Sequence, residues 1–197
     1  QFRESGIEVL TGHQAVSARP GKTGAKVVVV RDGISGATRE IECEEILVST
    51  GVRSNADRLA VEKTGVEVDR RGWILTDSYL QTNVPGIWAL GDINGKYQFR
   101  HKANYEADVL AGNLFRPAGD PERKQVHYDA VPWAIFTHPQ IAHVGMTEAQ
   151  AREKGGRLLV GYNRYSEVSK GYAMGYEPGD SDDGFVKLIA DENLRIL

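Results

Sequence analysis

The sequence has 197 residues, a net charge of −3 and 41% hydrophobic residues, which is enough for one or two globular domains. Charges of both signs are mixed along its length, and no basic cluster indicates a nucleic-acid site or a membrane surface. No apolar stretch approaches the ~18 residues of a membrane-spanning helix.

Cysteine and histidine usage narrows the possible chemistry. Cys43 is the single cysteine, so an intrachain disulfide and a thiolate metal site are both excluded, and we expect an ordinary strand residue there. The five histidines lack the spacing of metal ligands. We therefore expect no metal site and a cytoplasmic protein.

The N-terminal residues QFRESGIEVL have neither the apolar region nor the cleavage site of a signal peptide. They lack a starting methionine and resemble the middle of a domain. We expect a piece of a longer protein.

Residues 7–48 predict short strands joined by turns. The β-branched runs IEVLTG (7–12), KVVVVRDG (26–33) and IECEEILVSTG (41–51) each end in glycine, and GISGAT (33–38) predicts a turn. The segment PGKTG (20–24) resembles a phosphate-binding loop, but that motif needs glycine at the position of Val16. We interpret it as a hairpin turn.

Residues 49–116 alternate strand and helix signals. They run through ADRLAVEKTG, GWILTDSYLQT and GIWALGD to HKANYEADVLAGNLF, where apolar residues at helical spacing predict one buried face. That face consists of Ala103, Ala107, Leu110 and Leu114. Residues 117–125, with two prolines and four charges, predict a linker.

Residues 126–197 predict an α+β domain. Thr147 and Gln150 form a capping-box pattern for a helix that ends at Gly155. Strands are predicted at AVPWAIFT, RLLVGYNRY, GYAMGYE and GFVKLIA, in an antiparallel sheet.

Some side chains in this part invite a functional interpretation. Tyr172 and Tyr176 would share one strand face, where a core or dimer contact outweighs ring stacking. His143 is expected to be a partly exposed strand residue. The acidic loop GDSDDG (179–184) lacks the spacing of a calcium-binding loop, although calcium remains an alternative. The last residues, from Leu194, predict the start of another strand.

The junction of GIWALGD with the following helix carries the main chemical signal. Gly91 permits close approach of a ligand, and Asp92 can accept hydrogen bonds from sugar-like hydroxyls. The helix that begins near His101 has no capping Ser or Thr, so its free N–H groups suit an oxygen anion. The alternative is a plain turn followed by a helix that water caps.

Three segments resemble one family, the pyridine nucleotide–disulfide oxidoreductases. TNVPGIWALGD is similar to its second flavin motif, ILVSTGVRSNADRL to the segment before that motif, and AVPWAIFTHPQIAHVGMTEAQA to the start of its interface domain. GDINGKYQFRHKANYEA and SEVSKGYAMG most resemble the dihydrolipoamide dehydrogenase and mycothione reductase branches.

The resemblance implies an α/β plus α+β fold, in which part of an FAD/NAD(P)-binding Rossmann-type region precedes an incomplete interface domain. Residues 1–48 would be the C-terminal part of the NAD(P)-binding domain, 49–116 a central FAD-binding segment, 117–125 a linker, and 126–197 the domain that forms a homodimer. The whole protein would transfer electrons between NAD(P)H, FAD and a small disulfide or dithiol.

The resemblance also implies cofactor-binding roles. Gly91 and Asp92 would bind the ribityl chain of FAD, and Gly51 would lie near the nicotinamide dinucleotide. The backbone of the loop before the helix would pass the pyrimidine edge of the flavin; its residues are Gln98, Phe99, Arg100 and His101.

Other family motifs do not occur in this sequence. It contains no GxGxxG, no redox cysteine pair and no His-Pro…Glu element, and His138-Pro139 lies in the wrong place to be that element. We therefore expect no catalytic residue in the chain, and an isolated chain that is colourless and inactive. The alternatives are a mycothione, glutathione or mercuric reductase-type enzyme, or a non-catalytic interaction module.

Overall fold

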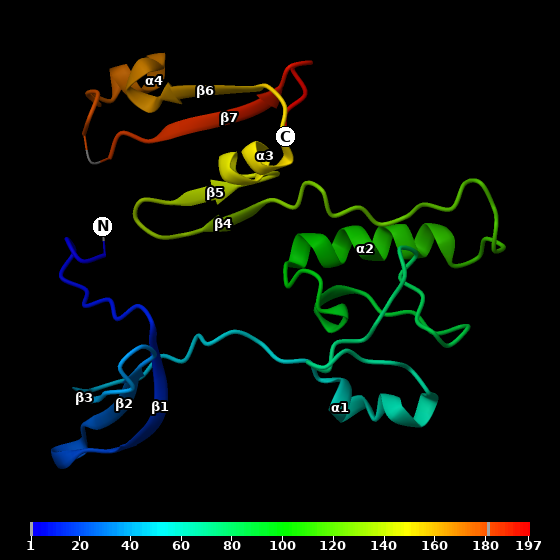
Figure 1. Ribbon diagram of the computed structural model, residues 1–197, viewed down its shortest axis with the longest axis horizontal. Helices are drawn as coiled ribbons and strands as arrows, with labels where there is room; N and C mark the ends of the chain where they lie inside the picture. Colours follow the sequence, from blue (N-terminus) through cyan, green and yellow to red (C-terminus); the bar gives the residue numbers. More distant parts are fainter. Residues whose placement is uncertain (1, 181) are drawn as a thin grey trace. The chain divides into compact units, whose positions relative to one another are not determined.

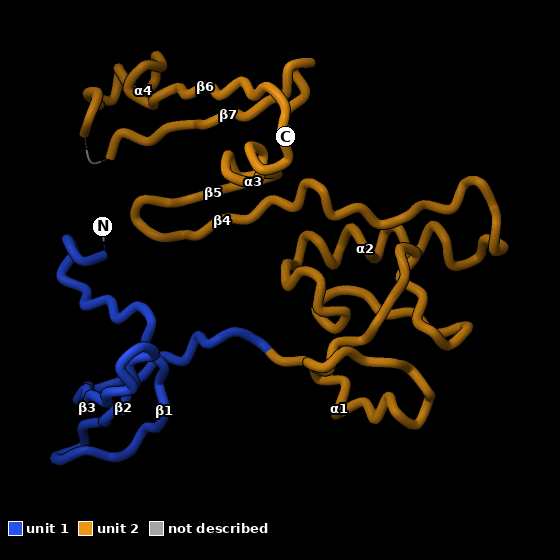
Figure 2. The backbone as a smooth tube through the Cα atoms, viewed as in Figure 1, with its two compact units in different colours: residues 1–52 blue, residues 53–197 orange. Residues whose placement is uncertain are grey.

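A computed structural model describes residues 2–180 and 182–197 (Figure 1). It forms two compact units, residues 1–52 and 53–197 (Figure 2), and each is described by itself. The strands are β1 His13–Pro20, β2 Lys26–Asp32, β3 Thr38–Cys43, β4 Trp133–Ile135, β5 Ile141–His143, β6 Leu158–Arg164 and β7 Phe185–Asp191. The α-helices are α1 Ala56–Leu59, α2 Arg100–Asn113, α3 Glu148–Lys154 and α4 Ser169–Ala173. The 3₁₀ turns are η1 Lys22–Gly24, η2 Val61–Thr64, η3 Gly91–Asn94 and η4 Tyr165–Glu167.

The first unit is an antiparallel sheet in the order β1-β2-β3. Both predicted turns are confirmed. The hairpin at η1 is closed by the Gly21 amide, which donates to the Ala25 carbonyl over 2.8 Å. In the second turn the Asp32 carboxylate accepts from the amides of Ile34 at 2.9 Å and Ser35 at 2.7 Å, as an aspartate at a turn start does. Cys43 is the last residue of β3, in agreement with its expected place on a strand.

Two predicted strand stretches in this unit are wrong. Residues 7–10 form no strand, and the chain joins the sheet only at His13, which pairs with the last residue of β2, Asp32. At the other end Cys43 pairs with Lys26, the first residue of β2. Because β2 offers no partner beyond either end, residues 44–51 also remain outside the ladder, and Leu47 is 92% exposed.

The second unit contains two apolar clusters. The first is built from Ala56, Val66, Ile74 and Ala89, and the second from Leu80, Val109 and Val126. The strands predicted at 72–82 and 86–92 are wrong, because only the isolated bridges Val68↔Ile74 and Gln81↔Trp88 form there. The chain is bent by the Asp77 carboxylate, which accepts from the amides of Tyr79 and Gln81, and by Leu80 at φ 65°.

Helix α2 confirms the helix predicted near His101, but the predicted buried face is displaced by one residue. Its buried side chains are Lys102, Glu106, Val109 and Asn113. Three of these four side chains are polar, so the spacing of apolar residues could not indicate that they are buried. Their burial is possible because each has hydrogen-bond partners inside the fold.

The segment after α2 is irregular but held in place. The Asn113 amide group donates to the Lys124 carbonyl over 2.7 Å, and the Lys124 amide donates to the Asn113 side-chain oxygen over 2.9 Å. The Val126 amide then donates to the Ser78 carbonyl over 2.9 Å. These bonds bring the segment that follows residue 125 back along α2.

Residues 131–197 contain two antiparallel pairs, β4–β5 and β6–β7, and helix α3. The capping box of Thr147 with Gln150 and the C-cap at Gly155 are confirmed. His143 lies on β5 and is half-buried, as expected. The predicted last strand is reduced to one bridge, Ala190↔Ile196.

The strand predicted at GYAMGYE is wrong, because α4 and a turn occupy these residues. Gly171 is the reason: a Cβ there would lie 1.8 Å from the Tyr165 carbonyl oxygen, so the chain packs backbone to backbone and folds over. The two tyrosines therefore share no strand face. Tyr172 is 82% exposed, and the ring of Tyr176 meets Tyr165 edge-on at 5.5 Å.

Within the described parts of the chain, no helix is both long and apolar enough to cross a bilayer.

Candidate functional site

The turn η3 joins the two apolar clusters of the second unit. Leu90, just before the turn, packs on the cluster of Leu80, whereas Ile93 packs on the cluster of Ile74. The Ile74 amide also donates to the Ile93 carbonyl over 3.0 Å. The turn is therefore anchored at both ends, although its sequence is only GDIN.

Glycines bracket this turn for a steric reason. Gly91 has φ +73°, and a Cβ there would lie 3.3 Å from the Cβ of Ala103 in the first turn of α2. Gly95 has φ +70°, and a Cβ there would lie 2.3 Å from Cγ of Trp73. Positive φ and close neighbours together require glycine at both positions.

Asp92 lies between these glycines and is exposed. Its carbonyl accepts a hydrogen bond from the Gly95 amide over 3.0 Å. Its carboxylate makes no hydrogen bond or ion pair with any residue that the structure describes. The backbone of the turn is held in place, and the Asp92 carboxylate that projects from it is free to accept hydrogen bonds from a ligand.

The N-terminus of α2 follows the turn after a five-residue loop. Phe99 occupies the N-cap position in extended conformation and gives no side-chain cap, and the first helical turn contains no acidic residue. The exposed Arg100 and His101 begin the helix. Free N–H groups, the helix dipole and Arg100 combine to favour negative charge at this point.

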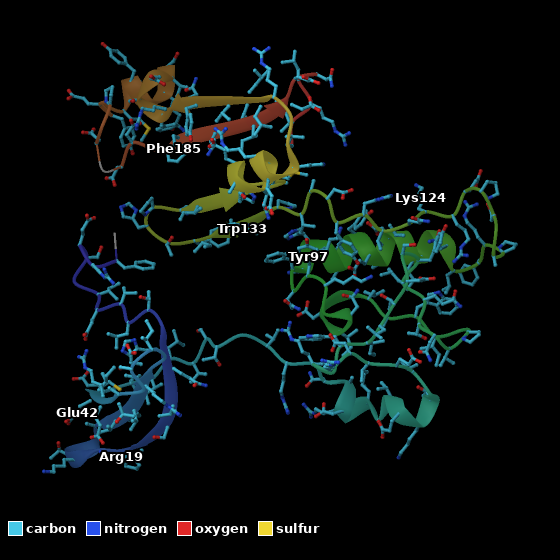
Figure 3. The ribbon with its side chains drawn as sticks, viewed as in Figure 1. Arg19, Glu42, Tyr97, Lys124, Trp133 and Phe185 are labelled. Atoms are coloured by element: carbon cyan, nitrogen blue, oxygen red, sulfur yellow. The ribbon has the colours of Figure 1, made fainter. Side chains whose placement is uncertain are left out.

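Aromatic rings form a column beside this helix start. Tyr128 stacks on Tyr97 at 5.4 Å, Tyr97 on Phe99 at 6.4 Å, and Phe99 on His101 at 5.4 Å, measured between ring centroids. Figure 3 shows Tyr97 near the start of α2 and Lys124 near its opposite end. The stacking fixes the loop that precedes the helix.

A cavity of about 350 Å³ opens beside the same helix start. His101 and Lys102 line it from α2, and His127 and Asp129 line it from the segment after the linker. Its walls therefore carry both basic and acidic groups.

Buried polar groups support the turn from inside, and sequence reasoning missed them. Glu106 is completely buried and accepts hydrogen bonds from the Gly91 amide, the Asn94 side chain and the Tyr128 hydroxyl. Lys102 is buried one helical turn earlier and donates to the His127 carbonyl. The i, i+4 spacing of this Lys–Glu pair was a visible signal, but such pairs usually lie on exposed helix faces.

Burial affects the titration of two of these groups. Burial lowers the pKa of Lys102, although Glu106 and Asp129 oppose the shift. Burial, followed by the hydrogen bond to Glu106, raises the pKa of Tyr128. Tyr128 therefore remains a protonated hydrogen-bond donor throughout the neutral range.

The expected cofactor-binding residues divide between the two units. The second unit contains six of them. In this unit the turn with Gly91 and Asp92 packs against helix α2, and residues 98–101 lead into the first turn of that helix. Gly51 belongs to the first unit, where it is exposed and has φ +91°.

Within residues 2–180 and 182–197, no group of three or more His, Cys, Asp or Glu side chains could hold a metal ion. Part of the acidic loop falls on residue 181, outside the described residues. Asp183 from this loop is engaged internally: it accepts from the Ser166 amide at 2.8 Å and from the Ser166 hydroxyl at 3.0 Å.

Known proteins similar to this chain include two curated enzymes and a solved structure. A dihydrolipoyl dehydrogenase of Cupriavidus necator is 33% identical over 191 residues, 97% of this chain and 38% of that protein. A mycothione reductase of Mycobacterium tuberculosis is 41% identical over 152 residues, 77% of this chain and 32% of that protein. The HOCl-induced flavoprotein disulfide reductase RclA from Escherichia coli superposes with a TM-score of 0.80 at 23% identity, over 100% of this chain and 42% of that one.

The chain thus spans less than half the length of these proteins. The structural likeness confirms the expected α/β plus α+β fold class. Residues 1–107 match the family described as pyridine nucleotide-disulphide oxidoreductase, and residues 131–197 match its dimerisation domain. Since the first match alone covers more than half of the sequence, the chain belongs to the pyridine nucleotide-disulphide oxidoreductase family.

Proposed function

We propose that these residues are part of an FAD-dependent oxidoreductase of the dihydrolipoamide dehydrogenase type, which transfers electrons between NAD(P)H, FAD and a small dithiol or disulfide. The single observation that carries the proposal is the exposed Asp92 carboxylate, which has no partner among the described residues and lies in a glycine-bracketed turn against α2. Family membership and the names of the similar enzymes support it.

The residues present fit one part of FAD. A carboxylate that only accepts hydrogen bonds suits the hydroxyls of a ribityl chain. The uncapped start of α2, without an acidic side chain in its first turn, suits the electron-rich pyrimidine edge of a flavin. When bound, FAD would supply hydride and electron transfer, and the chain would bind and orient it.

Each site residue receives a role in this proposal. Asp92 accepts a hydrogen bond from a ribityl hydroxyl, and Gly91 keeps the approach open. The backbone N–H groups of the loop from Gln98 to His101 face the pyrimidine edge. Gly51 lies near the nicotinamide dinucleotide.

The domain assignment remains part of the same proposal. Residues 1–48 complete an NAD(P)-binding domain, 49–116 form the central FAD segment, 117–125 link them to the interface domain, and 126–197 contribute to a homodimer. The match of residues 131–197 to a dimerisation domain supports the last assignment. A cytoplasmic location, with neither nucleic acid nor membrane as a partner, completes the proposal.

A mycothione reductase is the second candidate. The Mycobacterium tuberculosis enzyme of that name is 41% identical over 152 residues, a higher identity than the Cupriavidus protein has over 191. The two candidates share every residue role given above and differ in the dithiol or disulfide substrate that exchanges electrons with FAD.

The decisive experiment uses the gene product that contains these 197 residues. We expect a yellow protein with about one FAD per chain, which oxidises dihydrolipoamide with NAD⁺ faster than it reduces mycothione with NADPH. The opposite preference would select the second candidate. A folded, colourless gene product that binds no added FAD would contradict the proposal as a whole. The 197-residue chain by itself should be colourless and inactive, because no GxGxxG is present to bind the remainder of FAD.

A further inference from the structure

Glu106 is a charged residue of helix α2 with 0% exposure. One oxygen, Oε2, accepts from the Gly91 amide at 2.6 Å and from the Asn94 amide group at 3.1 Å. The other, Oε1, accepts from the Tyr128 hydroxyl at 2.7 Å. The carboxylate thus joins three chain segments: the turn η3, helix α2 and the segment after the linker.

Burying a carboxylate opposes folding unless its oxygens are well satisfied. Here three donors surround it, and the buried ammonium of Lys102 lies one helical turn away. Lys102 itself is held between the rings of Tyr105 and Tyr128, at 4.1 and 4.2 Å from their centroids. An apolar side chain at position 106 would fill this space but would leave the donors without an acceptor.

Two of the three donors belong to the turn that presents Asp92. Gly91 precedes Asp92 directly, and Asn94 follows it by two residues. Both point to the same carboxylate oxygen, so the backbone on either side of Asp92 is fixed to one point of α2. The backbone from which the Asp92 carboxylate projects is consequently held by a residue that is itself too buried to touch a ligand.

We propose that Glu106 is a positioning residue for flavin binding, which sets the orientation of the Asp92 carboxylate by accepting the Gly91 and Asn94 hydrogen bonds. This inference rests on the proposed function, since it gives Asp92 its role toward FAD. Under this proposal, the affinity for FAD depends on Glu106, although Glu106 does not itself contact the flavin.

The test is a double-mutant cycle between Glu106 and Asp92 in the full gene product. FAD is removed from each variant, and its dissociation constant is measured by titration with FAD. We expect Asp92→Ala alone to weaken FAD binding about ten- to a hundredfold. Glu106→Ala should weaken it by a similar factor, because the turn loses its acceptor. In the Glu106→Ala background, the further Asp92→Ala change should cost less than about threefold.

The conservative variant Glu106→Gln separates hydrogen bonding from charge. Its single carbonyl oxygen can still accept from Gly91 and Asn94, while the Tyr128 hydroxyl can turn to accept from the new amide. We therefore expect Glu106→Gln to recover most of the FAD affinity that Glu106→Ala loses. Asp108→Asn, the same loss of charge at an exposed position of α2, is the matched control and should leave the affinity unchanged.

Folding is monitored independently by the melting temperature of each apoprotein. If Glu106→Ala does not fold, Asn94→Ala takes its place in the cycle, because it removes one donor and leaves Glu106 bonded to Gly91 and Tyr128. It should weaken FAD binding about threefold and reduce the effect of Asp92→Ala.

Full additivity in this cycle would overturn the inference: Asp92→Ala would then cost the same factor with and without Glu106, and Glu106 would only stabilise the fold. Failure of the proposed function looks different, since the unaltered gene product would bind no FAD and the cycle would have no starting affinity.

Discussion

Gly91 and Ala103 meet so closely that a Cβ on Gly91 would lie 3.3 Å from the Ala103 Cβ. This contact brings the turn that carries Asp92 against the first turn of α2. The contact itself is apolar, and the hydrogen bond from the Gly91 amide to Glu106 orients the turn on the helix.

Gly91→Ala tests this contact. The new alanine must keep the left-handed backbone conformation of Gly91, and its methyl group must lie close to Ala103. We therefore expect the free energy of unfolding to fall by about 1–3 kcal/mol. Urea denaturation measures the change. Gly112→Ala is the matched control, because Gly112 lies within α2 with open space around it and ordinary φ. It should raise stability by about 0.5–1 kcal/mol. A loss of stability at both positions would show that the 3.3 Å contact is not the cause.

Arg100→Ala tests the positive potential at the start of α2. The reduced flavin carries negative charge that Arg100 and the helix N-terminus would stabilise, so the substitution should lower the two-electron potential of bound FAD. A loss of ~1 kcal/mol corresponds to ~20 mV. A redox titration of the gene product measures the shift. Lys124→Ala removes a positive charge near the other end of α2 (Figure 3) and should leave the potential unchanged. Equal shifts in the two variants would point to net charge alone.

Asp183 predicts a pH dependence of stability. Hydrogen bonds from the Ser166 amide, then from its hydroxyl and from Arg164, lower the pKa of Asp183 below its ordinary value. The unfolded chain then binds the proton more tightly, so the stabilisation is complete above the unfolded pKa of ~3.9 and is lost as the pH falls through the lower folded pKa.

The variant Asp183→Asn removes this titrating group. We expect it to be less stable than the unaltered chain at about pH 6, and the difference in unfolding free energy should shrink as the pH falls below ~4. Urea titrations over this pH range measure it. The other carboxylates are present in both proteins and cancel in the comparison. A difference that stays constant with pH would mean that the Asp183 pKa is the same folded and unfolded.

Val186→Asp tests self-association of the 197-residue chain. Val186 and Leu188 point to one face of the β6–β7 pair and are 61% and 54% exposed, within the segment that matches a dimerisation domain. Exposed apolar surface of this kind favours a partner chain, and we expect a dimer or larger oligomer at micromolar concentration.

Light scattering after size-exclusion chromatography decides this prediction. Val186→Asp should shift the chain toward the 21.7 kDa monomer. Val16→Asp, an equal change on strand β1 outside that segment, should not. A monomeric unaltered chain would contradict the prediction.

The sequence was a good guide wherever one segment determines its own structure. The α3 capping box, both turns of the first sheet and the start of α2 depend on residues within a few positions of each other, and all are confirmed. Predictions failed where the formation of a strand depends on whether a partner strand lies beside it. The apolar run around Leu47 has every local feature of a strand, yet β2 ends before it could pair with that run.

The site was predictable in outline only. Gly91, Asp92 and the uncapped helix follow from local residue types, and the structure brings them together. Glu106 could not be found in this way, because its burial depends on Tyr128, which is 22 residues away in the chain. Such long-range hydrogen bonds leave no periodic signal, and the apolar spacing of α2 identified the neighbouring face instead.

The indole of Trp73 occupies the space that a side chain at Gly95 would need, and only 5% of the residue is exposed. This packing gives the turn an optical reporter. A buried indole emits at shorter wavelength than one in water, so a turn that detaches from Trp73 would shift the emission to the red. In the 197-residue chain with Trp88 and Trp133 replaced by phenylalanine, the tryptophan fluorescence would follow the Asp92 turn alone.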